Sequence, residues 1–151
     1  IYRSAAQRHG FPLRLSESSL TRYVVIGRTQ ADAEKILHAL LPLLQERRIY
    51  YAARRGVARE DVPPIDRADL LRDQLILGDP DACVRQIVAL RRETGIGALR
   101  CVFNGNGVLA PEQANAQIRL FAETVLPRVR SASESCLSNY RSVEDDQGAH
   151  R

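Results

Sequence analysis

The sequence predicts an α/β protein with two parallel β-strands and flanking helices, and two observations carry this prediction. Apolar runs at 20–26 and 99–103 have the length and the aromatic and β-branched content of buried strands. Helical patterns with their own start and stop residues precede and follow both runs. Strands that alternate with helices form parallel sheets. Two strands are too few for a complete sheet, so we expect other chain segments to complete it.

The first strand, 20–26, follows a short helical stretch at 2–9 that Gly10 ends. Its continuous apolarity indicates that both of its faces are covered, as in a parallel sheet. Because side chains alternate along a strand, every second residue lies on the same face. One face carries Thr21, Tyr23 and Val25, and the other carries Arg22, Val24 and Ile26.

A long helix should follow this strand. Thr29 is a good N-cap, and Asp32 lies near the positive end of the helix. Pro42 lies inside the helical pattern, so it should kink the helix or start a second one that ends near Ala53. The apolar face of the helix contains Ala33, Ile36, Leu37, Leu40, Leu41 and Leu44.

The segment 54–69 should be a functional or mobile loop, because it combines Gly56, two prolines and alternating charges. A short helix is expected within 66–75. Gly78 then breaks the chain, Asp79 caps the next helix, and Pro80 fits the first helical turn.

That helix should end at Gly95, and the second strand follows at 99–103. Pro111 opens the last helix and Pro127 ends it. We therefore expect one domain at 1–130 and a disordered tail at 131–151, which is rich in Ser, Glu, Asp and Gln. The buried stripe of the last helix is predicted to contain Ala114, Ile118, Phe121, Ala122 and Val125.

Composition narrows the class of protein. No apolar run approaches the roughly 20 residues needed to cross a bilayer, and no signal segment opens the chain, so we expect a cytoplasmic protein without a membrane partner. The formal charge is +4, and arginine carries nearly all of the positive charge, some of it in adjacent pairs. We interpret this arginine content as a coding bias and expect no nucleic-acid partner, because acidic residues separate the pairs and aromatic residues do not interleave with them.

Neither the cysteines nor the histidines have the spacing of metal ligands, so no metal site is expected. Cys83 and Cys101 fall on a helix and in a strand, where they should act as small core residues. The chain begins at Ile1 and contains no Met, from which we expect that it is a piece of a longer protein or has lost an upstream segment.

The loop that follows the second strand, Asn104–Gly107, is the strongest local sign of a binding site. Barrel enzymes build their active sites at the carboxyl ends of their strands. Asn104 and Asn106 offer hydrogen-bond donors and acceptors, and glycine lets the backbone approach a ligand closely. The alternative is a turn in which the glycines only supply positive φ angles. Tyr23 is similarly open to two readings, a pocket residue that offers its hydroxyl group or a core aromatic residue.

Four segments, in this order, resemble the C-terminal part of the bacterial luciferase-like flavin monooxygenases. The first is a strand that runs into a Thr-x-x-Asp-Ala helix start, Val24–Ala33, and the second is the helix start Gly78–Asp81. A loop after a strand, Phe103–Gly107, and a helix end of the form Leu-Phe-x-x-x-Val-Leu-Pro, Leu120–Pro127, complete the set. The resemblance covers about residues 1 to 130, and the order of the four segments makes it fairly specific.

The resemblance implies the C-terminal part of a TIM-like (β/α)8 barrel, with 20–27 and 99–103 as late strands and a mobile shielding loop within 54–77. It implies an enzyme that reacts reduced FMN with dioxygen to oxidise a small organic molecule, with a deazaflavin as the alternative cofactor. A flavin reductase or another supply of reduced flavin, and a homo-oligomer, are its expected partners. The flavin-phosphate site and the catalytic residues would lie before Ile1.

Family members that act on sulfonates carry an Arg and a His at the positions of Thr21 and Tyr23, so this chain is expected to take a neutral, largely apolar substrate. The residues expected to line the substrate and flavin pocket are Thr21, Tyr23, Phe103, Asn104 and Asn106. Two other interpretations stay open. One is a non-catalytic, barrel-derived protein that binds a partner or dimerises, and the other is an unrelated α/β module whose arginine pairs bind an anionic partner.

If the chain holds only the end of a barrel, it should bind FMN weakly or not at all and should show no turnover by itself. Titration of FMN fluorescence with the purified chain measures this. Binding in the micromolar range by the chain alone would contradict the expectation that most of the flavin site lies elsewhere.

Overall fold

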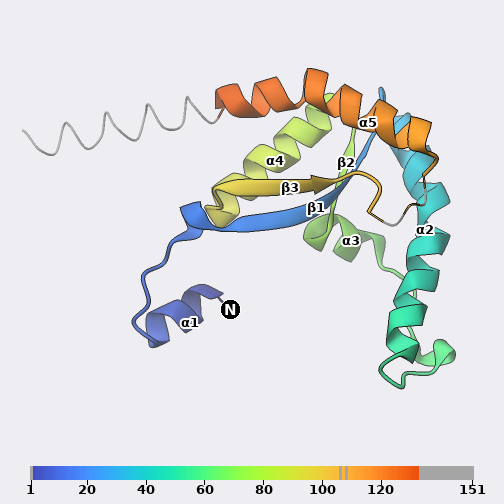
Figure 1. The fold of residues 1–151 in the computed structure, drawn as a ribbon, viewed down its shortest axis with the longest axis horizontal. Helices are drawn as coiled ribbons and strands as arrows, with labels where there is room; N and C mark the ends of the chain where they lie inside the picture. Colours follow the sequence, from blue (N-terminus) through green and yellow to red (C-terminus); the bar gives the residue numbers. More distant parts are fainter. Residues whose placement is uncertain (1, 106, 108, 133–151) are drawn as a thin grey trace, which may run out of the picture.

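A computed structural model describes residues 2–105, 107 and 109–132 of the chain. Its centre is a parallel sheet of three strands in the order β2-β1-β3 (Figure 1). The strands are β1 (Ser19–Ile26), β2 (Leu75–Gly78) and β3 (Ala98–Val102). The α/β class is therefore confirmed, and the sheet has one strand more than the sequence predicted.

Strand β1 is central because it pairs along both of its edges. Its last four residues, from Tyr23, pair with β2 from Leu75, and its first five, from Ser19, pair with β3 from Ala98. The two ladders overlap only at Tyr23, which has Leu75 on one side and Val102 on the other. Tyr23 is thus anchored through backbone partners on both strands.

Helices cover both faces of the sheet, as the unbroken apolarity of β1 predicts. One face packs on α2 (Gln30–Ala53) and α3 (Arg67–Asp73), and the other packs on α4 (Pro80–Thr94) and α5 (Pro111–Thr124). In Figure 1, α4 and α5 lie above β1 and β3, α3 lies below them, and α2 descends beside their carboxyl ends. The remaining elements are α1 (Tyr2–Arg8) and two 3-10 turns, Leu15–Glu17 and Arg59–Asp61.

Two apolar clusters hold these layers together, and they follow the alternation expected along β1. Val24 and Ile26 face α4 and α5, whereas Tyr23 and Val25 face α2 and α3. The first cluster buries Val24, Ile26, Ile76, Cys83, Ile87, Phe121 and Val125. The second buries Val25, Ala33, Leu37, Leu40, Leu70, Leu75 and Leu77. Cys83 is completely buried and Cys101 packs against the same cluster, so the interpretation of both as core residues is confirmed.

The order of the strands has a consequence for the relation to a barrel. Neighbouring strands of a closed (β/α)8 barrel follow the order of the chain, so β2 would lie between β1 and β3 there. In this structure β1 lies between β2 and β3. The sheet is built from parallel βαβ units, as such a barrel is, but its strands do not follow the order of the chain.

The helix caps lie where the sequence predicted them. Thr29 and Asp32 form a reciprocal capping box at the start of α2, in which the Asp32 N–H donates to the Thr29 hydroxyl over 3.1 Å. Asp79 accepts a hydrogen bond of 2.8 Å from the Ala82 N–H at the start of α4. Gly95 ends α4 with φ of 73°, in the left-handed region that glycine tolerates.

Pro42 does not divide α2, contrary to the prediction of a second helical piece. The helix runs for 24 residues through the proline. Pro42 and His38 are both exposed, so water can reach the His38 carbonyl that the missing proline N–H leaves without a helical partner.

Helix α5 is rotated relative to the predicted stripe, because Ile118 and Ala122 are exposed whereas Gln117 is buried. The Gln117 Oε1 accepts a hydrogen bond of 3.0 Å from the Ile26 N–H at the end of β1, which explains why a polar side chain occupies the core. Pro127 does not end the helical backbone either, since 126–132 is helical after a turn at Val125 and Pro127 lies in the first turn of that piece. Apart from Ser131 and Ala132, the predicted disordered tail lies outside the described residues.

Within the described part of the chain, no helix combines the length and the hydropathy that spanning a bilayer requires.

Gly97 provides a test of how the amino-terminal segment meets the sheet. A Cβ at this position would lie 1.7 Å from the Ser16 carbonyl oxygen, so Gly97→Ala must displace backbone. We expect a loss of about 3 kcal/mol in the free energy of unfolding, measured by urea denaturation. Gly10→Ala is the matched control, because its Cβ would meet nothing within 4 Å and only its positive φ costs about 1 kcal/mol. Equal losses for both variants would show that the contact with Ser16 does not constrain this junction.

Candidate functional site

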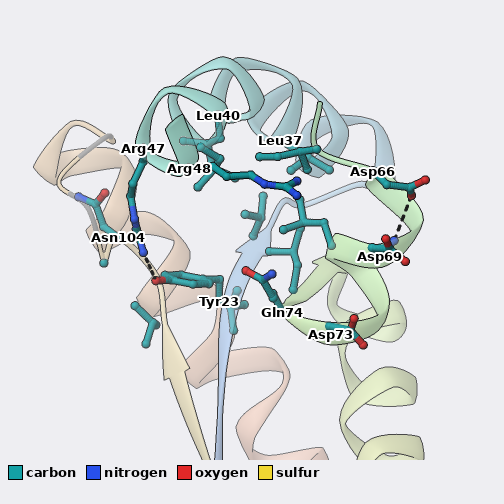
Figure 2. Close-up of a pocket in the computed structure, with 18 of the residues that line it drawn as sticks. Tyr23, Leu37, Leu40, Arg47, Arg48, Asp66, Asp69, Asp73, Gln74 and Asn104 are labelled. Carbon is teal, nitrogen blue, oxygen red and sulfur yellow. Dashed lines mark hydrogen bonds between the residues drawn. The ribbon is translucent and has the colours of Figure 1, made fainter. Parts of the chain in front are cut away.

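A cavity of about 670 Å³ lies beside the carboxyl end of β3, between the sheet, α2 and the segment that leads into α3 (Figure 2). This volume is in the range of sites for small molecules and cofactors. Its wall toward the core is apolar, and polar side chains from α2, α3 and the end of β3 surround the opening. The apolar wall includes Val25, Leu37, Leu40, Leu44, Leu70 and Leu75.

Tyr23 presents both its ring and its hydroxyl group to this cavity. The Arg47 Nη2 donates a hydrogen bond of 3.1 Å to the Tyr23 hydroxyl oxygen. The same guanidinium carbon lies 5.9 Å from the centre of the Tyr23 ring and 5.8 Å from the centre of the Tyr51 ring. Arg47 is therefore held between two aromatic residues, in a cation–π arrangement that fixes its position at the edge of the cavity.

The ring of Tyr23 packs so closely on position 105 that only glycine fits there. A Cβ on Gly105 would lie 2.9 Å from the Tyr23 Cε1 and 2.7 Å from the Val102 Cγ1. The close approach expected of a glycine in this loop is therefore made by a tyrosine ring. Gly107 has φ of 64°, so the second glycine supplies a left-handed turn.

Asn104 closes the loop that follows β3. Its Nδ2 donates to the Leu109 carbonyl oxygen over 3.0 Å, and its Oδ1 accepts from the Leu109 N–H over 2.9 Å. The side-chain amide thus pairs with both backbone groups of one residue, as a neighbouring strand would. This geometry favours a structural role, although Asn104 also lies at the rim of the cavity (Figure 2).

The remaining predicted site residues are divided. Thr21 is exposed and lies outside the cavity lining. Phe103 is part of the lining, but its ring packs edge-to-face on Phe121, with centroids 5.2 Å apart, in the cluster on the other side of the sheet. Asn106 lies outside the described residues. The structure therefore brings together Tyr23, Phe103 and Asn104 at one cavity and leaves Thr21 apart.

The sequence interpretation missed the contribution of α2 to this cavity. Arg47, Arg48 and Tyr51 line it, and they continue the helical spacing of the leucines that face the sheet. Extending that stripe by two more turns would have placed them on the same helix face as the leucines. The view that aromatic residues do not interleave with the arginine pairs was also wrong, because Tyr50 and Tyr51 lie between Arg48 and Arg54, and the Arg54 guanidinium lies 5.9 Å from the Tyr50 ring centre.

Three carboxylates also border the cavity, and each one caps α3 or forms an ion pair with Arg72 in this helix. Asp66 caps the helix by accepting from the Ala68 N–H at 2.6 Å and the Asp69 N–H at 3.1 Å. Arg72 pairs with Asp69 at 2.8 Å and with Asp73 at 2.7 Å. The hydrogen bond from Arg72 holds the pKa of Asp73 below its ordinary value. A carboxylate stabilised as the anion in this way is a poor proton donor, which argues against Asp73 as a general acid.

Neither Cys83 nor Cys101, the two cysteines in the described part of the chain, offers a nucleophile. Burial, together with the nearby Asp79 charge, raises the pKa of the Cys83 thiol to about 12, and burial also raises the pKa of Cys101. Thiols need a lowered pKa to react as thiolates near neutral pH. Among the described residues, no group of three His, Cys, Asp or Glu side chains is arranged to hold a metal ion.

Comparison with solved structures shows a likeness in fold. No protein-family model matches the chain, and no curated protein matches it. A similar solved structure is the oxygenating constituent of 3,6-diketocamphane monooxygenase from the CAM plasmid of Pseudomonas putida, a type II Baeyer–Villiger monooxygenase in complex with FMN. The TM-score is 0.54 at 20% sequence identity, over 85% of this chain and 38% of that chain. The two proteins share a fold over this region, and this chain spans well under half the length of that enzyme.

The pair of hydrogen bonds between Asn104 and Leu109, called the Asn104 clasp below, can be tested without any ligand. Asn104→Ala removes both hydrogen bonds to Leu109, and we expect a loss of about 1–2 kcal/mol in unfolding free energy with faster hydrogen exchange at the Leu109 amide. Asn104→Asp keeps the acceptor for that amide but sets a second oxygen against the Leu109 carbonyl oxygen, so its protection should fall between those of the unchanged chain and Asn104→Ala. Asn115→Ala, on the exposed face of α5, is the control and should leave Leu109 unchanged. Unaltered exchange at Leu109 in Asn104→Ala would rule out the clasp.

Proposed function

We propose that this chain is the C-terminal part of a luciferase-like flavin-dependent monooxygenase, which oxidises a small organic molecule with reduced FMN and dioxygen. The observation that carries the proposal is the fold shared with an FMN-bound monooxygenase over 85% of the chain. The four segments that resemble the luciferase-like family support it independently, because they rest on residue identity and order and not on shape.

The cavity beside β3 supports a role in enclosing the substrate. Its apolar wall, formed by α2, α3 and β1, excludes water from one side of a bound molecule. Pro63, Pro64 and Ile65, from the segment expected to shield the site, also line it. Tyr23 and Arg47 together offer an ordered donor and an aromatic surface where the apolar wall ends.

The residues at this cavity fit one side of a flavin or substrate site. Tyrosine rings and an arginine donor suit a flat, partly polar ring, and the volume is adequate for one. Reduced flavin, when bound, supplies the electrons that activate dioxygen. This chain's own residues would position the organic molecule and keep water away. The alternative cofactor remains a deazaflavin, and a flavin reductase or another source of reduced flavin is the expected partner in the cytoplasm.

The outer edges of β2 and β3 are where the rest of the protein would join the sheet. Neither edge has a strand partner among the described residues. Unpaired strand edges tend to recruit further strands. We propose that other segments of a longer chain add there and complete a TIM-like sheet around β1. The same open edges favour one alternative, a non-catalytic relative that uses them to dimerise or to bind a partner.

The proposal is tested by comparing two proteins, this chain alone and the chain extended by the residues that precede Ile1 in its reading frame. We expect the extended protein to bind FMN at micromolar concentration and to consume dioxygen with reduced FMN when an organic substrate is added. The chain alone should do neither. An extended protein without flavin affinity would overturn the assignment, and a stable, cooperatively unfolding dimer of the chain alone would favour the non-catalytic alternative.

A further inference from the structure

Two adjacent arginines border the cavity, and this charge was not expected for a site that takes a neutral molecule. Arg47 is fixed between Tyr23 and Tyr51, as described above. Arg48 extends from α2 across the cavity toward the segment before α3 (Figure 2). The sequence analysis predicted no cationic side chain at this site, because Thr21 and Tyr23 occupy the strand positions where such a residue was sought. Helix α2 supplies the cations from the opposite wall.

Two bonds that these arginines make on the cavity wall end on neutral oxygens. Arg47 donates to the Tyr23 hydroxyl group, and the Arg48 Nη1 donates to the Pro64 carbonyl oxygen over 3.5 Å. The Arg48 bond is at the long limit for a hydrogen bond and is therefore weak. Within the described part of the chain, Arg48 makes no ion pair. A carboxylate could replace the Pro64 contact and form a stronger, charge-assisted pair.

The three aspartates at the cavity lie on its α3 side, apart from the leucines that Arg48 spans. Figure 2 shows Asp66, Asp69 and Asp73 on the α3 side, with their carboxylates turned away from the middle of the cavity. Asp66 is committed to the cap of α3, and Arg72 pairs with the other two. Arg48 instead reaches over the apolar wall formed by the leucines. The centre of the cavity therefore combines an apolar surface with a positive group.

From this combination we infer that the cavity binds an apolar monoanion, an aliphatic or alicyclic carboxylate, with its anionic head on Arg48 and its hydrocarbon body against Leu37, Leu40 and Leu75. The role of this carboxylate as the substrate rests on the proposed function. The guanidinium fork matches a carboxylate in two parallel hydrogen bonds. The substrate class is then anionic and amphiphilic, in place of the neutral class expected from β1 alone.

One other source offers similar chemistry, the phosphate group of the flavin itself. The apolar wall favours the organic acid, because a phosphate is surrounded by water or by polar groups in most sites, whereas leucines form much of the lining here. Comparing FMN with riboflavin, which lacks the phosphate, separates the two sources.

The experiment titrates octanoate, octanamide and octylamine into the chain of 151 residues and follows binding by calorimetry and by amide chemical shifts. The three probes share a hydrocarbon body and differ in the charge of the head group. We expect octanoate to bind at least tenfold more tightly than octanamide and octylamine not to bind, with shifts near Arg48 and Leu75. Raising the salt concentration should weaken the binding of octanoate and leave the binding of octanamide nearly unchanged.

Substitutions of Arg48 test whether this residue binds the carboxylate group of octanoate. Arg48→Gln should weaken octanoate about tenfold, to the level of octanamide, and Arg48→Lys should restore part of the loss because it keeps the charge without the fork. Arg55→Gln, the same substitution just beyond the end of the same helix and outside the cavity lining, is the control and should bind octanoate normally. Circular dichroism of each variant shows that it is folded.

Several results would overturn the inference. These are no octanoate binding to the folded chain, equal affinity for octanoate and octanamide, or equal losses in Arg48→Gln and Arg55→Gln. In the extended protein, a loss of affinity in Arg48→Gln that is larger for FMN than for riboflavin, with octanoate binding unaffected, would assign the arginine to the cofactor phosphate. None of these titrations requires flavin turnover. Octanoate binding without any flavin activity in the extended protein would therefore reject the proposed function and keep the anion site.

Discussion

The double pairing of β1 is the constraint on which the rest of the structure depends. A strand with hydrogen-bonded neighbours on both edges and helices on both faces cannot shift its register by one residue, because that would turn Val24 and Ile26 out of one core and Val25 out of the other. This fixed register places Tyr23 where both ladders meet. The cavity then forms around Tyr23 as α2 crosses the carboxyl ends of the strands, so the site is a product of the central strand and not of a loop alone.

Much of the fold was readable from local chemistry, and the exceptions have physical causes. Thr29, Asp79 and Gly95 bound their helices because each residue satisfies backbone groups at a helix end, and this need is visible in the sequence. Strand β2 was missed because its four residues follow a leucine-rich helix, and a short apolar run does not distinguish a buried strand from a helical turn. Gln117 was missed because its partner, the Ile26 N–H, is 91 residues away.

The candidate site was predicted in part for the same reason. Tyr23 and Asn104 could be named because they lie on or just after strands, where sheet geometry fixes which end carries a site. Thr21 was placed with Tyr23 by alternation, but it lies further from the carboxyl end and is exposed. Arg47 and Arg48 come from the far half of a long helix, and only the packing angle of that helix decides whether they meet the cavity. No periodicity in the sequence specifies that angle.

The hydrogen bond from Ile26 to Gln117 also bears on how the protein is made. A ribosome releases β1 before β2, β3 and Gln117, so the central strand leaves the exit tunnel with both edges unpaired and its last N–H without an acceptor. Such a chain has to wait for contacts of high sequence separation, which slows folding and exposes apolar strands in the meantime. The N-terminal half of this protein consequently keeps its apolar strand surface exposed until translation supplies the residues that cover it.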